Sequence, residues 1–118
     1  MSEEDLAGHR GEWVETLSPE YAGAEIHEIP PNGQGIAALQ ILNVLEQHDI
    51  AALGHNSADF IHLYTEAKKL AFTDRAKFYA DPQVEKNLPV AELISKPYAK
   101  RQAKRIDMAK AALRVPAG

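Results

Sequence analysis

The sequence predicts an α+β, helix-rich fold in which a short antiparallel strand pair is followed by helices. Apolar and polar residues alternate in the first part of the chain, as they do in half-buried strands. From residue 35 onward the apolar residues recur every three or four positions, as they do in amphipathic helices. The chain has 118 residues, of which 45% are apolar, and a single domain typically has about 100–150 residues. We therefore expect one domain over residues 1–118, with a strand pair over residues 12–29 and a helical part over residues 35–114.

The N-terminal residues predict one short helical turn rather than a targeting segment. Ser2 is a suitable N-cap for residues 2–9, and Asp5 follows at the third position, close to a capping box. This stretch is acidic and has no apolar run, so we do not expect a signal peptide. No apolar run in the chain approaches the roughly 20 residues that span a bilayer. The compartment in which the protein works therefore stays open.

The predicted strand pair consists of residues 12–17 and 24–29, which alternate loosely between apolar and acidic side chains. The residues between them, SPEYAG, have turn chemistry. Pro30 and Pro31 end the second strand because proline has no backbone N–H to donate.

Two longer helices are predicted after the glycine-containing residues 33–35. The first runs to His48, with apolar residues at helical spacing: Ile36, Leu39, Ile41, Leu42, Val44 and Leu45. The second begins after a cap at Asn56 or Ser57 and ends before Pro82. Its apolar face is expected to contain Phe60, Leu63, Tyr64, Ala67, Leu70, Ala71 and Phe78. Its charged residues are expected mostly on the other side: Lys68, Lys69, Asp74, Arg75 and Lys77.

The last part of the chain predicts a short helical stretch over residues 90–94 and a final helix from Lys96 to about Leu113. The chain has a formal net charge of −4, but residues 96–118 contain seven basic residues and one acidic residue. A phosphate-contacting stripe is therefore one hypothesis for Lys96, Lys100, Arg101, Lys104 and Arg105. No recognised nucleic-acid motif accompanies these residues and the rest of the chain is acidic, so a charge match within the chain or with another subunit is the favoured interpretation.

Residues 33–38 read GQGIAA, which has the spacing of a dinucleotide-binding fingerprint. Asp49 or Asp59 would be the ribose-binding acid. However, residues 30–32 separate the preceding strand from the glycines, and a helix, not a second parallel strand, follows. We therefore interpret the glycines as a strand-to-helix corner, and we expect no cofactor.

No metal site or catalytic group is predicted. His62 and Glu66 are four residues apart, but a zinc site of that type needs a second histidine, and Glu66 suits the flank of a solvated helix. His55 can help to cap the second long helix, and three further histidines have no partners at ligand spacing: His9, His27 and His48. Hydroxyl groups occur in unsuitable settings for a nucleophile, at Ser57, Thr65, Thr73 and Ser95. Without cysteine, disulfides and thiolate chemistry are excluded.

Several ordered blocks resemble the γ-glutamyltransferase (γ-glutamyltranspeptidase) family. Residues 21–46 read YAGAEIHEIPPNGQGIAALQILNVLE, where the family has a Y-x-G strand, a Pro-Pro pair, a glycine corner and a helix ending in L-N-I-L-E. Further blocks are HNSAD at 55–59, EAKKLAFTDR at 66–75, YADP at 79–82 and LISKPYA at 93–99. Residues 1–7 also resemble the lead into this region. The resemblance covers nearly the whole chain.

The resemblance implies an N-terminal nucleophile hydrolase with an αββα sandwich. Members of this family cleave their own precursor before a threonine, which becomes the nucleophile on the small subunit and attacks γ-glutamyl amides such as glutathione. The present sequence matches the last part of the large subunit, before that threonine. Carried over residue by residue, no catalytic, substrate-binding, cofactor or metal role falls on any position of this sequence. We therefore expect a partial domain that is inactive alone.

The glycine corner, residues 30–35, is more similar to γ-glutamyltransferase-like amidohydrolases than to the glutathione enzymes, which would have serines beside the glycines. An amide other than glutathione, such as oxamate, is therefore open as substrate. The expected partners are the remainder of the large subunit and the small catalytic subunit. The isolated chain is also expected to self-associate, through the helix over residues 36–47 or through the strand pair, because a slice of a sandwich exposes apolar surface. The alternative function is a stand-alone helical interaction module, nucleic-acid-binding through residues 96–105.

Overall fold

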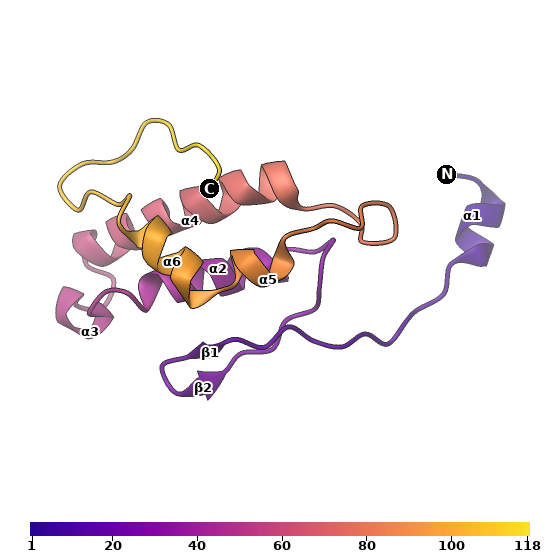
Figure 1. Ribbon diagram of the computed structural model, residues 1–118, viewed down its shortest axis with the longest axis horizontal. Coiled ribbons are helices and arrows are strands. Elements are labelled where there is room, and N and C mark those ends of the chain that lie inside the picture. The colour runs from indigo at the N-terminus through magenta and orange to yellow at the C-terminus, as the bar shows by residue number, and fades with distance from the viewer.

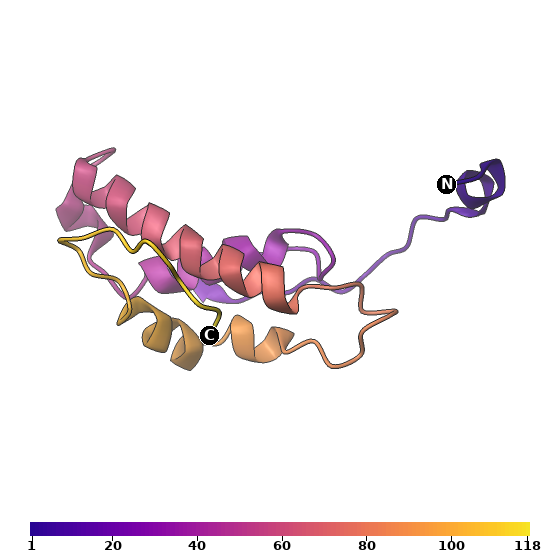
Figure 2. The same ribbon diagram turned by 90° about the horizontal axis from the view of Figure 1, so that it is seen from above.

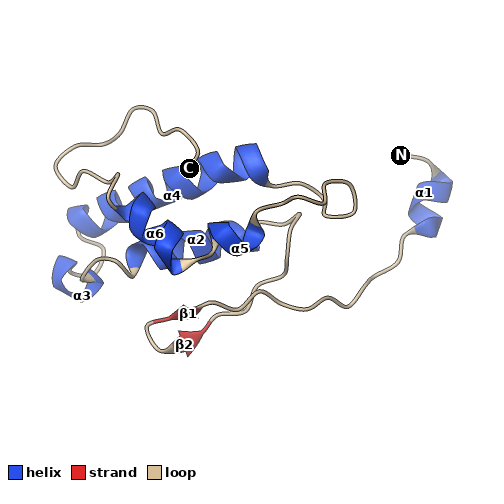
Figure 3. Ribbon diagram, in the orientation of Figure 1, coloured by secondary structure: helices blue, strands red, loops and turns tan.

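The computed structural model describes all residues, 1–118, and it is helix-rich with one short antiparallel strand pair (Figures 1 and 3). This confirms the predicted fold class at that level. In chain order the elements are α1 (Glu3–Gly8), β1 (Glu20–Tyr21), β2 (Ala24–Glu25), α2 (Gly35–Leu45), α3 (Ile50–Leu53), α4 (Ala58–Phe78), α5 (Val90–Leu93) and α6 (Lys96–Ala103). No helix has both the length and the apolar composition that crossing a membrane requires.

The core lies where α2, α4 and α6 pack together. Nine of the eleven residues of α2 are buried, since α4 covers one of its sides and α6 another. The main cluster is rich in alanine, which lets helix backbones approach closely; its buried members are Ala37, Ile41, Val44, Leu45, Leu63, Ala67, Ala71, Ala99 and Ala103. Both long helices therefore occur where the apolar periodicity predicts them.

Helix α4 begins as predicted, and its buried face agrees with the predicted apolar face only in part. The side chain of Ser57 caps it by accepting from the backbone N–H of Phe60 at 3.0 Å. Asp74 and Glu66, both predicted on the solvent side, are 1% and 3% exposed. Tyr64, predicted on the apolar face, is 42% exposed. The predicted apolar face is therefore confirmed at Leu63, Ala67, Leu70 and Ala71, which are buried, and the placement of Tyr64, Glu66 and Asp74 was wrong.

The strand pair is a tight hairpin that is shorter than predicted. Ala22 and Gly23 have positive φ angles of 50° and 82°, as a two-residue hairpin turn requires. This turn pairs Glu20 with Glu25 and leaves one further bridge, between Leu17 and Glu28. The prediction of a first strand over residues 12–17 was wrong. If the register of this hairpin continued, residues 14 and 15 would pair with Pro31 and Pro30, which have no backbone N–H to donate.

The N-terminal arm lies away from the helical body. The predicted capping box is present in α1, where Ser2 and Asp5 exchange two hydrogen bonds, of 2.7 and 3.2 Å. Residues 1–16 are all exposed, and Figures 1 and 2 both show α1 separated from the other helices. The ring of Trp13 is fully exposed.

The final helix is shorter than predicted, because α6 ends at Ala103 and not near Leu113. The N–H of Arg105 and that of Ile106 bond to carbonyl groups three residues back, at 2.9 and 3.1 Å, which tightens and ends the helix. Asp107 then accepts from the N–H of Ala109 with its side chain, a local bond that competes with helix. Residues 107–118 turn back along α4, as the yellow segment shows in Figure 2. The short α3 has no counterpart among the predicted elements.

Candidate functional site

A buried carboxylate network is the most polar feature of the core. Oδ2 of Asp74 accepts from Nε2 of Gln40 at 2.8 Å and from the hydroxyl of Tyr98 at 2.6 Å. Its Oδ1 accepts from the backbone N–H of Gly118 at 2.9 Å. The hydroxyl of Tyr79 donates to Oε1 of Gln40 at 2.5 Å. The network therefore joins α2, α4, α6 and the segment that follows α6.

The two tyrosines of this network are held in their protonated form. Burial, with a further contribution from the charge of Asp74, raises the pKa of Tyr79 well above its ordinary value. Burial and then the hydrogen bond to Asp74 raise the pKa of Tyr98 in the same direction. Both hydroxyls are committed donors, so neither is poised to act as a general base. The arrangement stabilises the helix packing.

The sequence-based prediction missed this network, although one signal was available. Leu63, Ala67, Leu70 and Asp74 follow one another at intervals of four, three and four residues. That spacing continues the buried stripe of α4 through Asp74. An acid in such a stripe indicates a buried carboxylate with partners on other helices.

A second network fixes the hairpin to the helices through Lys96. Its Nζ lies 2.5 Å from Oε2 of Glu46 and 2.7 Å from Oδ1 of Asn43, and it also bonds to the carbonyl oxygen of Glu20. The N–H of Ala22 donates to the other oxygen of Glu46 at 2.9 Å. This backbone bond, followed by the bond from Lys96, lowers the pKa of Glu46. Every charged group here is satisfied within the chain.

The glycine corner has a packing explanation. A Cβ added at Gly35 would lie 2.8 Å from the carbonyl oxygen of Ile29 and 2.9 Å from Cβ of Glu28. Gly33 has no contact closer than 3.7 Å at the same position. The corner therefore needs glycine at residue 35 because two backbone segments approach each other there. The acids considered as ribose ligands belong to other sites: Asp49 caps α3, and Asp59 lies in the first turn of α4.

The histidine and hydroxyl candidates are not brought together. His62 contacts the carbonyl oxygen of Asp107 at 2.9 Å, while Glu66 forms a 2.5 Å ion pair with Lys69. No group of three or more potential ligands converges in a metal-binding arrangement. Ser95 caps α6, and Thr73 donates to a carbonyl oxygen within α4. Ser57, as described above, caps α4.

The basic residues near the end of the chain do not form one helical stripe. Lys96 is engaged with Glu46, and Arg101 forms a 3.0 Å ion pair with Glu92. Arg105 lies beyond the end of α6 and donates to Gln102 at 2.5 Å. Of the five predicted residues, only Lys100, Arg101 and Lys104 therefore remain exposed on α6 or its C-cap without a contact to Glu46 or a place beyond the helix.

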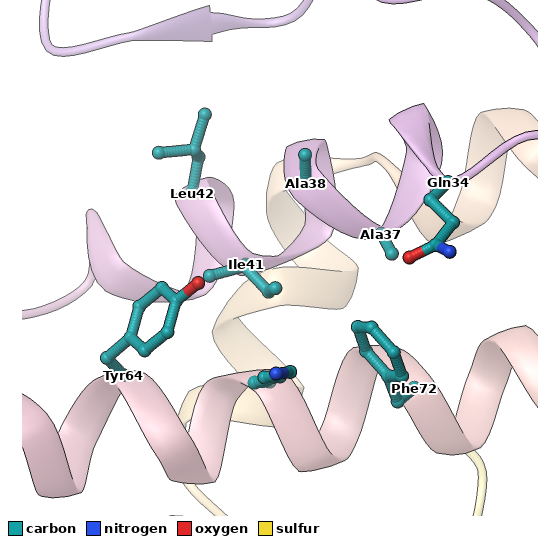
Figure 4. Close-up of a pocket in the computed structure, with 8 residues that line it drawn as sticks. Gln34, Ala37, Ala38, Ile41, Leu42, Tyr64 and Phe72 are labelled. Carbon is teal, nitrogen blue, oxygen red and sulfur yellow. The ribbon is translucent and has the colours of Figure 1, made fainter.

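An open apolar groove lies between α2 and α4, with a volume of about 400 Å³. Figure 4 shows Ile41 and Ala37 directed from α2 toward Tyr64 and Phe72 of α4, while Leu42 and Ala38 point away from α4. The full lining consists of Gln34, Ala37, Ala38, Ile41, Leu42, Tyr64, Lys68 and Phe72. The ammonium of Lys68 lies 5.3 Å from the centre of the Phe72 ring. The groove has apolar walls but no set of converging polar groups.

The family of this chain is shown by a match of residues 1–116 to the family model described as gamma-glutamyltranspeptidase. The chain belongs to the gamma-glutamyltranspeptidase family. Within it the chain corresponds to the C-terminal part of the large subunit. This confirms the resemblance inferred from the sequence blocks.

Individual gamma-glutamyltranspeptidase relatives agree with this assignment. The chain is 44% identical over 112 residues to the acylase ACY 1 proenzyme of Pseudomonas sp. (strain SE83), covering 94% of the chain and 20% of the relative. It is 38% identical over 106 residues to the glutathione hydrolase-like YwrD proenzyme of Bacillus subtilis (strain 168), covering 90% and 20%. The crystal structure of Helicobacter pylori gamma-glutamyltranspeptidase superimposes with a TM-score of 0.85 and 33% identity, over 93% of this chain and 32% of that one. The chain thus spans about a fifth of the length of the curated relatives it matches.

The blocks that resemble gamma-glutamyltranspeptidases also supply the internal contacts described above. LISKPYA contributes the cap Ser95, the hairpin anchor Lys96 and the buried Tyr98. EAKKLAFTDR contributes Glu66 and Asp74. In this member of the family these motif residues hold helices, hairpin and the last segment together.

Proposed function

We propose that this chain is a scaffold segment of an amide-hydrolysing or acyl-transferring enzyme whose nucleophile is an N-terminal threonine on a separate small subunit. The observation that carries the proposal is the family match over residues 1–116. The family's mechanism uses the threonine amine as its own base. In the assembled enzyme this segment would form part of the helical layer of an αββα sandwich.

The interior of the chain fits a scaffold role. Its buried charged groups, Asp74 and Glu66, are saturated by donors from the chain itself. Catalytic carboxylates and bases need a free position that faces substrate. We therefore propose that the isolated chain turns over neither γ-glutamyl amides nor other acyl amides.

We propose a small acyl amide rather than glutathione as the substrate class of the parent enzyme. The similarity to an acylase proenzyme, at 44% identity, supports this. The corner sequence PPNGQG, without serine beside its glycines, points the same way. The corner itself carries no substrate contact in this proposal and marks only the branch of the family.

The proposed partners are the remainder of the large subunit and the small catalytic subunit. Two exposed apolar features support this. One is the groove between α2 and α4, and the other is the N-terminal arm with Trp13 and Leu6, which are 104% and 65% exposed. Surface of this kind in a globular protein marks an interface.

A two-part experiment tests the proposal. The purified 118-residue chain is assayed with γ-glutamyl-p-nitroanilide and with a glutaryl amide, and no turnover is expected; turnover would refute the scaffold role. The matching segment of the ACY 1 proenzyme is then replaced by this chain. We expect self-cleavage into two chains and acyl-amide hydrolysis. If the replacement protein folds but is not cleaved, the proposal that this chain acts as the large-subunit scaffold segment is wrong.

A further inference from the structure

Residues 107–110 form a turn and residues 111–118 then lie along α4, and the whole segment is held through backbone atoms. His62 contacts the carbonyl oxygen of Asp107 at 2.9 Å. One helical turn farther along, Ala112 is held on both sides: its carbonyl oxygen accepts from Lys69 at 2.7 Å, and its N–H donates to Glu66 at 3.3 Å. The N–H of Gly118 reaches Asp74 at 2.9 Å. The segment thus runs parallel to α4 over three successive anchor points.

The last anchor point leaves no room for a side chain in its present geometry. A Cβ added at Gly118 would lie 2.0 Å from Nε2 of Gln102 and 2.1 Å from the hydroxyl of Tyr98. Both of these side chains belong to buried residues of α6. Tyr98 is also committed to Asp74, so its hydroxyl cannot simply turn aside. A larger residue at this point would have to displace these side-chain ends or move the backbone away from Asp74.

The hydrogen bonds that hold the segment are made to its backbone atoms, not to its side chains. Leu113 is 96% exposed and Arg114 is exposed as well, while the apolar residues Val115 and Ala117 are half-buried and none of residues 107–118 is fully buried. The apolar contribution to holding the segment in place is therefore small. Segments that are fixed mainly by exposed or partly exposed hydrogen bonds open at low free-energy cost.

The anchors keep partners when the segment leaves. Asp74 retains the hydrogen bonds from Gln40 and Tyr98. Glu66 retains its ion pair with Lys69. No buried charge loses its last partner when the segment leaves. An unpaired buried charge would be the main free-energy cost of opening. The internal bonds of the receiving surface therefore do not involve the segment.

We propose that α4 and α6 form a peptide-binding groove that takes an extended segment with glycine at the Asp74 anchor, and that residues 107–118 are its occupant in cis. The groove recognises three backbone positions, those of Asp107, Ala112 and Gly118, and selects glycine at the last through Tyr98 and Gln102. A peptide of the same sequence added in trans competes with the tethered segment. The tethered segment has the advantage of a high effective concentration.

The test uses the full 118-residue chain with Gly118→Ala and a matched control, Gly11→Ala, since a Cβ at Gly11 has nothing within 4 Å. Amide hydrogen exchange is followed over residues 107–118. We expect Gly118→Ala to speed exchange at Ala112 by about tenfold, the equivalent of one lost hydrogen bond, while Gly11→Ala matches the wild type. Far-UV circular dichroism checks that the helices stay formed. Unchanged exchange in the Gly118→Ala chain would overturn the proposal.

Binding in trans provides an independent measurement. A fluorescent peptide with the sequence of residues 107–118 is titrated into each chain, and a second peptide carries alanine at the position of Gly118. We expect the first peptide to bind the Gly118→Ala chain more tightly than the wild-type chain, whose groove is occupied. The alanine peptide should bind neither. Equal binding of both peptides, or no binding of the first to the Gly118→Ala chain, would overturn the groove and its selectivity for glycine.

Discussion

The hydroxyl of Tyr98 in α6 donates a 2.6 Å hydrogen bond to the carboxylate of Asp74 in α4. The bond spans 24 residues of sequence and lies in the core, where both residues are almost fully buried. It converts a carboxylate that would be costly to bury into a link between two helices. The stability of the helical body should therefore depend on this one hydroxyl.

Replacing Tyr98 by phenylalanine removes the hydroxyl and leaves the ring. We expect a loss of about 1–3 kcal/mol in the free energy of unfolding, because Asp74 loses a donor in the core. Urea unfolding followed by circular dichroism measures it. Tyr64→Phe is the matched control, since Tyr64 is 42% exposed. Equal effects of the two substitutions would contradict the role of the buried bond.

The raised pKa values of Tyr79 and Tyr98 predict a loss of stability in alkali. The ordinary pKa of tyrosine is about 10, and burial raises both values in the folded chain. Between the unfolded and folded pKa values the unfolded chain has released protons that the folded chain keeps, so stability falls as pH rises above about 10. Tyrosinate absorbance near the unfolding transition should show a cooperative step. Smooth titration of all the tyrosines without unfolding would contradict this.

Gly35→Ala should be much more destabilising than Gly33→Ala. A Cβ at residue 35 would meet the carbonyl oxygen of Ile29 at 2.8 Å, whereas at residue 33 its nearest neighbour is the flexible end of Ile29 at 3.7 Å. Forcing an extra methyl group into such a contact costs about 1–3 kcal/mol. Thermal unfolding of both variants measures the difference. Equal stability would mean that the corner moves freely.

The long helices are the part of the fold that the sequence predicts best, because α2 and α4 carry apolar periodicity over many residues and have recognisable caps such as Ser57. The end of α6 is different. Residues 104–113 continue a helical pattern, and their actual course depends on Glu66 and Lys69, more than 40 residues away. No local pattern contains that information.

The buried polar residues show the same limit of prediction from local sequence. Asp74 has the spacing of a buried residue but the chemistry of an exposed one, and only its partners decide between the two. Those partners, Gln40 and Tyr98, come from different helices. The glycine corner could be interpreted from sequence because proline and glycine constrain the backbone locally.

Acid should release the hairpin before it unfolds the helices. The bonds from Ala22 and Lys96 lower the pKa of Glu46, so the stabilisation they provide is present above the unfolded value of about 4.3 and is lost as pH falls below it. Lys96→Met should produce the same loosening at neutral pH, visible as faster amide exchange over residues 17–28. Lys100→Met, on the exposed side of the same helix, is the control. If amide protection over residues 17–28 changes neither with pH nor in the Lys96→Met chain, this prediction is wrong.

The groove between α2 and α4 predicts concentration-dependent self-association of the isolated chain. Leu42 and Ala38 belong to the lining of the groove and point away from α4 in Figure 4, and an apolar hollow of about 400 Å³ is available to a second copy. Burying such surface is favourable by about 25 cal/mol per Å² of apolar area, before the cost of association. Light scattering should show dimers or larger species at high concentration.

Leu42→Lys should shift them to monomer, because a charge would have to be buried in the contact. Val84→Lys is the control, since Val84 is 83% exposed and lies outside the groove. A wild-type chain that stays monomeric at every concentration would contradict the prediction, and association that survives Leu42→Lys would move the contact to the hairpin or the N-terminal arm.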